Sequence, residues 1–199
     1  MSTFPEIPEV TLTRAQRFAQ FFTLLVAVLG LALGFLLKSQ VLGATQSFRD
    51  LAAGVQAQYP ANWLLDSGDE YVFRVRDPLS SGFPTTFQVS VISIGDDAAA
   101  RNIVDNQSLE RARTLAAYRV LPPDPTFVLP DGSAATWLEY FYVDTESNPF
   151  LETSPSVVHG VDVVAIERGQ AIIITFRVEA TRFDEELSRF EQFLAALDF

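Results

Sequence analysis

Residues 156–180, SVVHGVDVVAIERGQAIIITFRVEA, decide the fold of this 199-residue chain. Two long runs, 156–167 and 170–180, flank Arg168-Gly169, and glycine tolerates the positive φ that a tight hairpin turn requires. Apolar side chains occur on both faces of each run. A strand that is apolar on both faces must be covered on both sides, so this hairpin predicts the centre of a sheet between two layers.

A second hairpin signal precedes the first, at Asp131-Gly132 between the runs 126–129 and 133–143. Shorter strands are expected before it, because apolar and polar residues alternate and Pro ends two of the three runs. These shorter runs are 55–59, 70–76 and 85–94. The apolar side chains of 133–143 divide into Trp137, Phe141 and Val143 on one face and Leu138, Tyr140 and Tyr142 on the other.

Two helices are predicted to supply the covering layers. Residues 101–118 contain no Gly or Pro and carry apolar residues near helical spacing. Residues 182–198 carry an apolar stripe, and Thr181 with Asp184 is typical of a helix cap. The stripes are Ile103, Leu109, Ala112, Leu115 and Ala116 in the first helix and Phe183, Leu187, Phe190, Leu194 and Leu197 in the second.

A membrane-spanning helix is predicted near the N-terminus. The run 18–37 has no charged residue and lies between Arg17 and Lys38, and Thr13 with Gln16 forms a capping-box pattern ahead of it. As a helix, this run rises roughly 30 Å, which is the thickness of the hydrocarbon core of a bilayer. A cleaved signal peptide is the alternative, although its apolar region usually spans only about 7–15 residues.

The flanking charges predict the topology of this helix. Arg14 and Arg17 precede the span, only Lys38 closely follows it, and most of the acidic excess lies beyond it. The positive-inside rule then places the N-terminus in the cytoplasm and the C-terminal domain in the periplasm or outside the cell, with a single pass through the cell membrane. The fold class is therefore α+β, with one N-terminal transmembrane helix followed by an α/β/α sandwich whose central sheet is mainly antiparallel. The predicted organisation is a tail at 1–13, the transmembrane helix at 14–38, a linker at 39–50 and the extracytoplasmic domain at 51–199.

A resemblance to a known family begins at Tyr59-Pro60-Ala61-Asn62-Trp63. This pattern is similar to the Tyr-Pro-x-x-Trp that follows the first strand in the family of the photosystem II extrinsic protein PsbP and its bacterial relatives, whose fold is shared with the Ran-binding protein Mog1. The resemblance implies a non-catalytic subunit or adaptor on a larger complex, with an electron-transport or photosynthetic host. Because Lys38 is the only Lys, docking through a Lys-rich surface does not carry over. Physically, the two aromatic residues also serve as a plug for one end of the sheet.

Composition excludes several function classes. The net charge of −11 repels phosphate backbones, so nucleic-acid binding is not expected. The absence of Cys and the presence of a single His, His159, exclude thiolate metal sites, His-ligated haem and a Cys–His nucleophile pair. Neither a phosphate-binding GxxxxGK[ST] loop nor a GxSxG elbow occurs. We therefore expect no enzyme activity, no catalytic residue and no cofactor, and a structural role for His159 on a strand face.

A calcium site is the one metal site that the composition allows. Asp66, Asp69 and Glu70 form an acidic cluster, and carboxylate oxygens are the ligands that Ca²⁺ prefers. The spacing fits no known calcium loop. The alternative is a solvated turn, because Asp side chains bond nearby backbone amides in turns.

Two N-terminal patterns suggest contacts with partner subunits. Gly30 and Gly34 form a GxxxG pattern that lets a second membrane helix approach closely, although such spacing also arises by chance. Phe4, Ile7 and Val10 recur at the period of a polyproline II helix and could dock as a strip. The alternative for this segment is a solvated tail.

The long connection at 144–155 is the last candidate contact. Phe150 and Leu151 place two large apolar side chains in a loop longer than hairpins usually need. Exposed, they would form a small anchor on a partner; folded back, Phe150 would pack as a satellite of the core.

Two functions remain open at this stage. The first is an accessory subunit that contacts other membrane protein subunits and lipid through its helix and its outer domain. The second is an anchored extracytoplasmic module that binds or senses a small ligand or metal, alone or as a homodimer.

Overall fold

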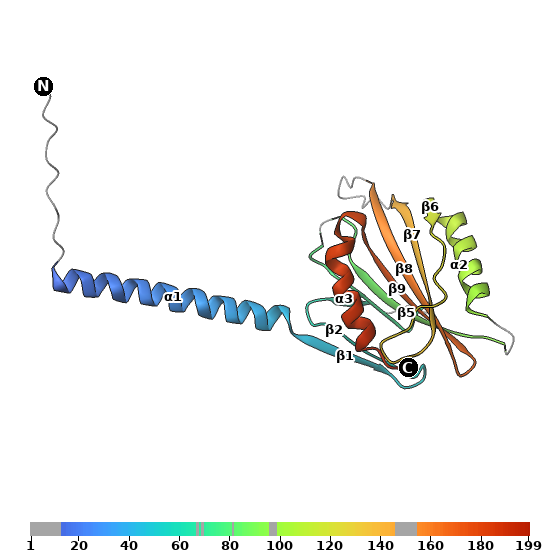
Figure 1. Cartoon of the computed structure of the whole chain (residues 1–199), viewed down its shortest axis with the longest axis horizontal. Helices are drawn as coiled ribbons and strands as arrows, with labels where there is room; N and C mark the ends of the chain where they lie inside the picture. Colours follow the sequence, from blue (N-terminus) through green and yellow to red (C-terminus); the bar gives the residue numbers. More distant parts are fainter. Residues whose placement is uncertain (1–12, 67, 69, 81, 96–98, 146–154) are drawn as a thin grey trace, which may run out of the picture. The chain divides into compact units, whose positions relative to one another are not determined.

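A computed structural model describes residues 13–66, 68, 70–80, 82–95, 99–145 and 155–199. The chain divides into two compact units, residues 1–44 and residues 45–199. The described part of the first unit is dominated by helix α1, Arg14–Leu42. The second unit is an α/β domain (Figure 1).

Helix α1 begins with the predicted capping box. The Thr13 amide donates to Oε1 of Gln16 at 2.9 Å, and the Gln16 amide donates to Oγ1 of Thr13 at 3.4 Å. The segment Arg14–Lys38 has a mean hydropathy of 2.3 over its most apolar window, and none of that window is buried within the described structure. Its length and composition suit a membrane anchor, and an N-terminal signal sequence has the same features.

The centre of the domain is a seven-stranded sheet in the order β3-β4-β5-β9-β8-β7-β6. Every neighbouring pair in it is antiparallel, which confirms the predicted sheet type. The strands are β3 (Leu64–Asp66), β4 (Phe73–Arg76), β5 (Thr86–Ser93), β6 (Ala116–Val120), β7 (Ala135–Asp144), β8 (Ser156–Glu167) and β9 (Gln170–Glu179).

The hairpin β8–β9 lies in the middle of this sheet, as the sequence predicts. Glu167 pairs with Gln170, and the turn between them has φ values of 50° at Arg168 and 75° at Gly169. Positive φ at both central residues is the geometry of a type I′ turn, whose twist matches that of the flanking strands. The register of the two central strands is therefore set by a two-residue loop.

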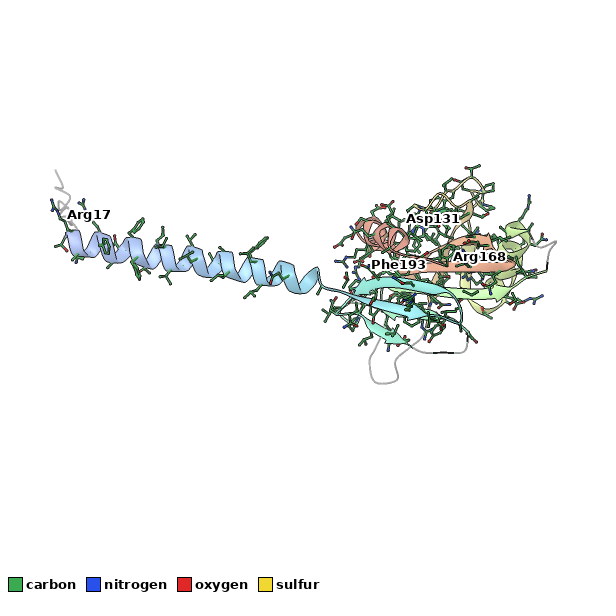
Figure 2. All side chains as sticks on the ribbon, turned by 90° about the horizontal axis from the view of Figure 1, so that it is seen from below. Arg17, Asp131, Arg168 and Phe193 are labelled. Atoms are coloured by element: carbon green, nitrogen blue, oxygen red, sulfur yellow. The ribbon has the colours of Figure 1, made fainter. Side chains whose placement is uncertain are left out.

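One face of the sheet is covered by helix α3 (Phe183–Ala195) and by a separate two-stranded hairpin of β1 (Thr45–Asp50) and β2 (Val55–Pro60) (Figure 1). Both elements bury apolar side chains in the same core cluster as β4, β5, β8 and β9. Phe193, labelled in Figure 2, lies in this layer with its ring 5.0 Å from that of Phe87. The C-terminus joins the hairpin, because Gln56 and Asp198 exchange backbone hydrogen bonds.

Helix α2 (Ala100–Thr114) covers the other face, so the domain is the predicted α/β/α sandwich. Val104 is the one fully buried residue of α2 among those described, and it packs against Leu138, Val164 and Ile173. The predicted apolar stripe of this helix forms only in part, since Ile103 packs against this cluster but Leu109 is 52% exposed. Polar contacts, which are described below, also hold the helix to the sheet.

Two boundaries differ from the sequence prediction. The helix expected at 101–118 ends at Thr114, and Ala116–Val120 forms the edge strand β6 because it pairs with β7. The linker expected at 39–50 is ordered structure, since α1 continues to Leu42 and Thr45–Asp50 pairs with β2. In both places a long-range strand pairing decides the structure, and local sequence does not encode it.

Two further local predictions are corrected. Thr181 lies in a 3₁₀ turn, Ala180–Arg182, and makes no capping bond to α3. The start of α3 is stabilised instead by acidic side chains in its first turn, including Asp184, because negative charge interacts favourably with the positive end of the helix dipole. The run 126–129 forms no regular strand but only an isolated bridge between Val128 and Ala134.

Candidate functional site

A groove of about 450 Å³ lies on the α3 face of the domain. Strand β7 forms its floor, α3 forms one wall, and the segment after β6 forms the other. A volume in this range is typical of ligand and peptide sites. The lining residues are Leu121, Pro122, Asp124, Phe127, Trp137, Glu139, Leu187, Glu191 and Leu194.

The wall after β6 is held to the floor by backbone hydrogen bonds. The Leu121 amide donates to the carbonyl of Glu139 at 2.9 Å. Asp124 and Trp137 exchange two bonds, of 2.8 and 2.9 Å, in an isolated antiparallel bridge. The segment therefore continues the edge of the sheet without being a regular strand, and it holds Asp124 beside Trp137.

The floor of the groove is aromatic. The Trp137 ring lies 5.0 Å from the Phe127 ring and 6.1 Å from the Phe190 ring, measured between centroids. Phe190, on the buried side of α3, is fully buried, whereas Trp137 and Phe127 are only partly buried. The buried ring supports a partly exposed aromatic surface whose faces are electron-rich.

A chain of polar contacts crosses this floor. The Trp137 Nε1–H donates to Oε1 of Glu139 at 2.9 Å, and Oε2 of Glu139 lies 3.1 Å from Nε2 of His159. The His159 ring is stacked between Phe141 and Phe183, at centroid distances of 4.1 and 3.5 Å. Burial lowers the pKa of His159, and the nearby Glu139 carboxylate only partly opposes this effect. His159 is thus the structural residue predicted from sequence, and it fixes the orientation of Glu139.

Asp124 and Glu191 complete the polar part of the groove. Oδ1 of Asp124 accepts hydrogen bonds from the amide and the hydroxyl of Thr126, at 2.9 and 2.6 Å. These bonds lower the pKa of Asp124, which favours its charged form. Glu191 is an exposed residue of α3. The described lining therefore combines apolar side chains with three carboxyl groups, and it includes no Lys or Arg.

A second polar cluster, on the opposite face, is a structural clamp. The guanidinium of Arg111 in α2 donates to both carboxylate oxygens of Asp162, which is fully buried in β8. Thr175 donates its hydroxyl to the same carboxylate at 2.8 Å, and the guanidinium lies 4.3 Å from the centroid of the Tyr140 ring. Burial alone lowers the pKa of Arg111, but the Asp162 charge and other neighbours raise it above its ordinary value. The clamp adds to the small apolar contact that Ile103 and Val104 of α2 make with the sheet.

Of the three predicted calcium ligands, the structure describes Asp66 and Glu70. Oδ2 of Asp66 lies 3.4 Å from Nε of both Arg74 and Arg76, so two positive charges already neutralise it. Glu70 is exposed, and Asp69 lies outside the described residues. Across the described part of the chain, no group of three or more His, Cys, Asp or Glu side chains could hold a metal ion.

The predicted partner contacts are placed only in part. Gly30 and Gly34 are exposed in α1, and apart from adjacent residues and the backbone of the helix itself, no described atom lies within 4 Å of a Cβ built at either position. This face of the helix is open to close approach. Phe4, Ile7, Val10, Phe150 and Leu151 lie outside the described residues.

The motif that carried the family resemblance is part of the core. Tyr59 and Trp63 are only 6% and 5% exposed, and their rings pack against Phe73 and Phe87 at 5.5 and 4.7 Å. The Trp63 amide donates to the carbonyl of Pro60, which closes the turn between them. Tyr59 and Trp63 are therefore buried members of the hydrophobic core.

Several solved structures are similar to this chain in fold, among them a PsbP protein. Cyanobacterial PsbP (CyanoP) from Synechocystis sp. PCC 6803 is 16% identical, with a TM-score of 0.57, and the match covers 77% of this chain and 91% of that one. LpqN of Mycobacterium tuberculosis is 12% identical, with a TM-score of 0.50, and the match covers 78% of this chain and 90% of that one. The chain has the PsbP/Mog1-like fold.

The Ran-binding protein Mog1p of Saccharomyces cerevisiae is also similar, at 9% identity and a TM-score of 0.48, over 77% of this chain and 94% of that one. At such identities the similarity concerns the fold alone. No family model matches the sequence, and no curated protein matches it.

The groove residues of this fold were not singled out from sequence. Asp124, Glu139 and Glu191 come from three separate segments, and no local motif links them. The one available signal was Pro122-Pro123-Asp124-Pro125, which predicts an irregular segment where a β-strand would otherwise continue.

Proposed function

We propose that this protein is a non-catalytic, single-pass membrane accessory subunit whose PsbP/Mog1-like domain binds another subunit of a membrane complex on the extracytoplasmic side. One observation carries the proposal: α1 is long and apolar enough to cross a bilayer, and within the described structure none of its most apolar window is buried. An uncleaved helix of this kind would hold the domain at the membrane surface.

Three further features support the proposal. CyanoP, which has a similar fold, is a PsbP protein, and the PsbP resemblance implies a photosynthetic or electron-transport host. LpqN, described as involved in cell envelope biogenesis, supports a role at an envelope. The open Gly30 and Gly34 face provides a surface for a second helix.

The test is purification of the C-terminally tagged full chain from its native membrane in mild detergent, followed by mass spectrometry. We expect an uncleaved N-terminus and stoichiometric membrane subunits bound to the protein. Gly30→Leu with Gly34→Leu should release a subunit bound through the helix, while Val28→Leu with Ala32→Leu, on the opposite side of the same helix, provides the control. A cleaved N-terminus, or a lone monomer after gentle extraction, would contradict the proposal.

An anchored ligand-binding module is the second candidate, and the 450 Å³ groove is the observation that favours it. In that case the purified protein would be a monomer or homodimer with a bound small molecule. Native mass spectrometry of the same preparation separates the two candidates.

A further inference from the structure

The groove on the α3 face has an unbalanced charge. Asp124, Glu139 and Glu191 converge on it from the segment after β6, from β7 and from α3. Among the described residues, no Lys or Arg forms an ion pair with any of the three. Carboxylates elsewhere in the domain, such as Asp162 and Glu186, are each held by arginine. The groove therefore carries three carboxyl groups with no Lys or Arg partner in the described part of the chain.

The carboxylates are also arranged to accept a further donor. Hydrogen bonds from Thr126 use Oδ1 of Asp124 and favour its charged form, and no hydrogen bond within the described structure uses its Oδ2. Glu139 is oriented by Trp137 and His159, and its side chain is 30% exposed. A preoriented carboxylate binds a cation at a lower entropic cost than a free one.

The aromatic floor suits the same ligand. Trp137 and Phe127 present partly exposed rings between the carboxyl groups. A guanidinium or ammonium group over such a ring is attracted by its electron-rich face, and Trp is the strongest of these partners. Leu187 and Leu194 offer apolar contact to the methylene stem of a long basic side chain.

Apolar surface continues beyond the groove along the edge of the sheet. Val120, Leu121 and Val128 are 45%, 44% and 57% exposed. A small cation would leave these side chains in water, whereas a polypeptide segment with apolar residues beside its basic residue would cover them.

We propose that the groove binds a segment of a partner protein that carries an arginine or lysine side chain flanked by apolar residues. The basic side chain lies over Trp137 among the three carboxylates, and its apolar neighbours cover the exposed edge. This inference rests on the proposed function, because it names the chemistry of the partner segment that the domain recognises.

The test measures binding of defined peptides to the full chain in detergent, by the change in tryptophan fluorescence. Trp137 lines the groove, and the only other Trp, Trp63, is buried in the core. The probes are acetyl-Leu-Arg-Leu-amide, the same peptide with neutral citrulline in place of Arg, and argininamide. We expect saturable binding of the Arg peptide, about tenfold weaker binding of both other probes, and weaker binding at higher salt.

Matched variants locate the binding. Glu191→Gln should weaken binding of the Arg peptide about three- to fivefold, as expected for loss of one exposed charge. Glu185→Gln, on the exposed surface of the same helix but outside the groove, should leave binding unchanged. Leu121→Ser should weaken binding of the Arg peptide but not binding of argininamide. Leu109→Ser, on α2, is the control and should change neither affinity.

Each contrary outcome overturns the inference. Equal affinity for the Arg and citrulline peptides would show that charge does not contribute to binding. Equal affinity for the Arg peptide and argininamide would show that the groove binds a small cation and not a peptide segment. If the fluorescence shows no saturable change, or if Glu191→Gln and Glu185→Gln weaken binding equally, the groove is not the binding site. None of these results affects the co-purification of membrane subunits, so the proposed function fails or stands separately.

Discussion

Replacing Arg111 by Met is expected to destabilise the domain by about 3–5 kcal/mol, because a buried carboxylate loses the charge that compensates it. The side chain of Asp162 has 0% exposure, and Arg111 is the only basic residue described as ion-paired with it. The remaining bond, from the Thr175 hydroxyl at 2.8 Å, compensates only part of the desolvation. For a domain of this size, the loss corresponds to a fall in Tm of roughly 6–20 °C.

Two further variants separate the buried pair from the helix that carries it. Arg113→Met removes a neighbouring arginine of α2 whose partner Glu110 is largely exposed, so it should cost less than about 1 kcal/mol. Arg111→Met combined with Asp162→Val removes both charges. It should recover a large part of the loss, because an apolar pair leaves no buried charge without a partner.

The assay is urea unfolding of the full chain in detergent, followed by near-ultraviolet circular dichroism. If Arg111→Met and Arg113→Met lower the free energy of unfolding equally, the Arg111–Asp162 pair is not the clamp that we describe. If the double variant is less stable than Arg111→Met alone, uncompensated charge is not the source of the loss.

Three further predictions concern the core and the groove floor. Phe190→Ala, at a fully buried ring, should cost about 3–5 kcal/mol in urea unfolding, and a loss below about 1 kcal/mol would contradict the aromatic core. Gly160→Ala should destabilise the domain in thermal melts, because an added Cβ would overlap the Tyr140 ring; an unchanged Tm would refute this packing. Since burial lowers the pKa of His159 below its unfolded value, protonation favours unfolding, and stability should fall as pH drops below about 6.5. His159→Gln should reduce this loss between pH 7 and pH 5 in urea midpoints, and an equal pH dependence in both proteins would exclude His159 as its source.

Residue patterns predicted the elements whose structure depends on neighbouring residues. The turn at Arg168-Gly169 forms because glycine admits the required positive φ, and the long strands on either side are apolar on both faces. The capping box at Thr13 and the apolar span after it also depend on local spacing. The apolar stripe of α3 is confirmed, with Phe190 and Leu194 buried.

The failures share a different cause. No residue between Arg101 and Tyr118 breaks a helix, yet α2 ends at Thr114, because the next residues pair with the exposed edge of β7. Thr45–Asp50 forms a strand because it pairs with β2. In both places the deciding hydrogen bonds join distant segments, and their free energy exceeds the small differences in local propensity.

The candidate site depends on tertiary structure even more strongly. By itself, the sequence determined the class of the protein: an apolar helix long enough to span a bilayer, an acidic domain without Cys, and a two-sided sheet. Only the folded chain brought Asp124, Glu139 and Glu191 to one aromatic groove. Periodicity records which side of an element is apolar, because solvent exposure repeats with the turn of a helix or the pleat of a strand. It carries no record of which separate segments become neighbours, so the convergence of the three carboxyl groups was decided by the packing of α3 and the β6 edge on the sheet.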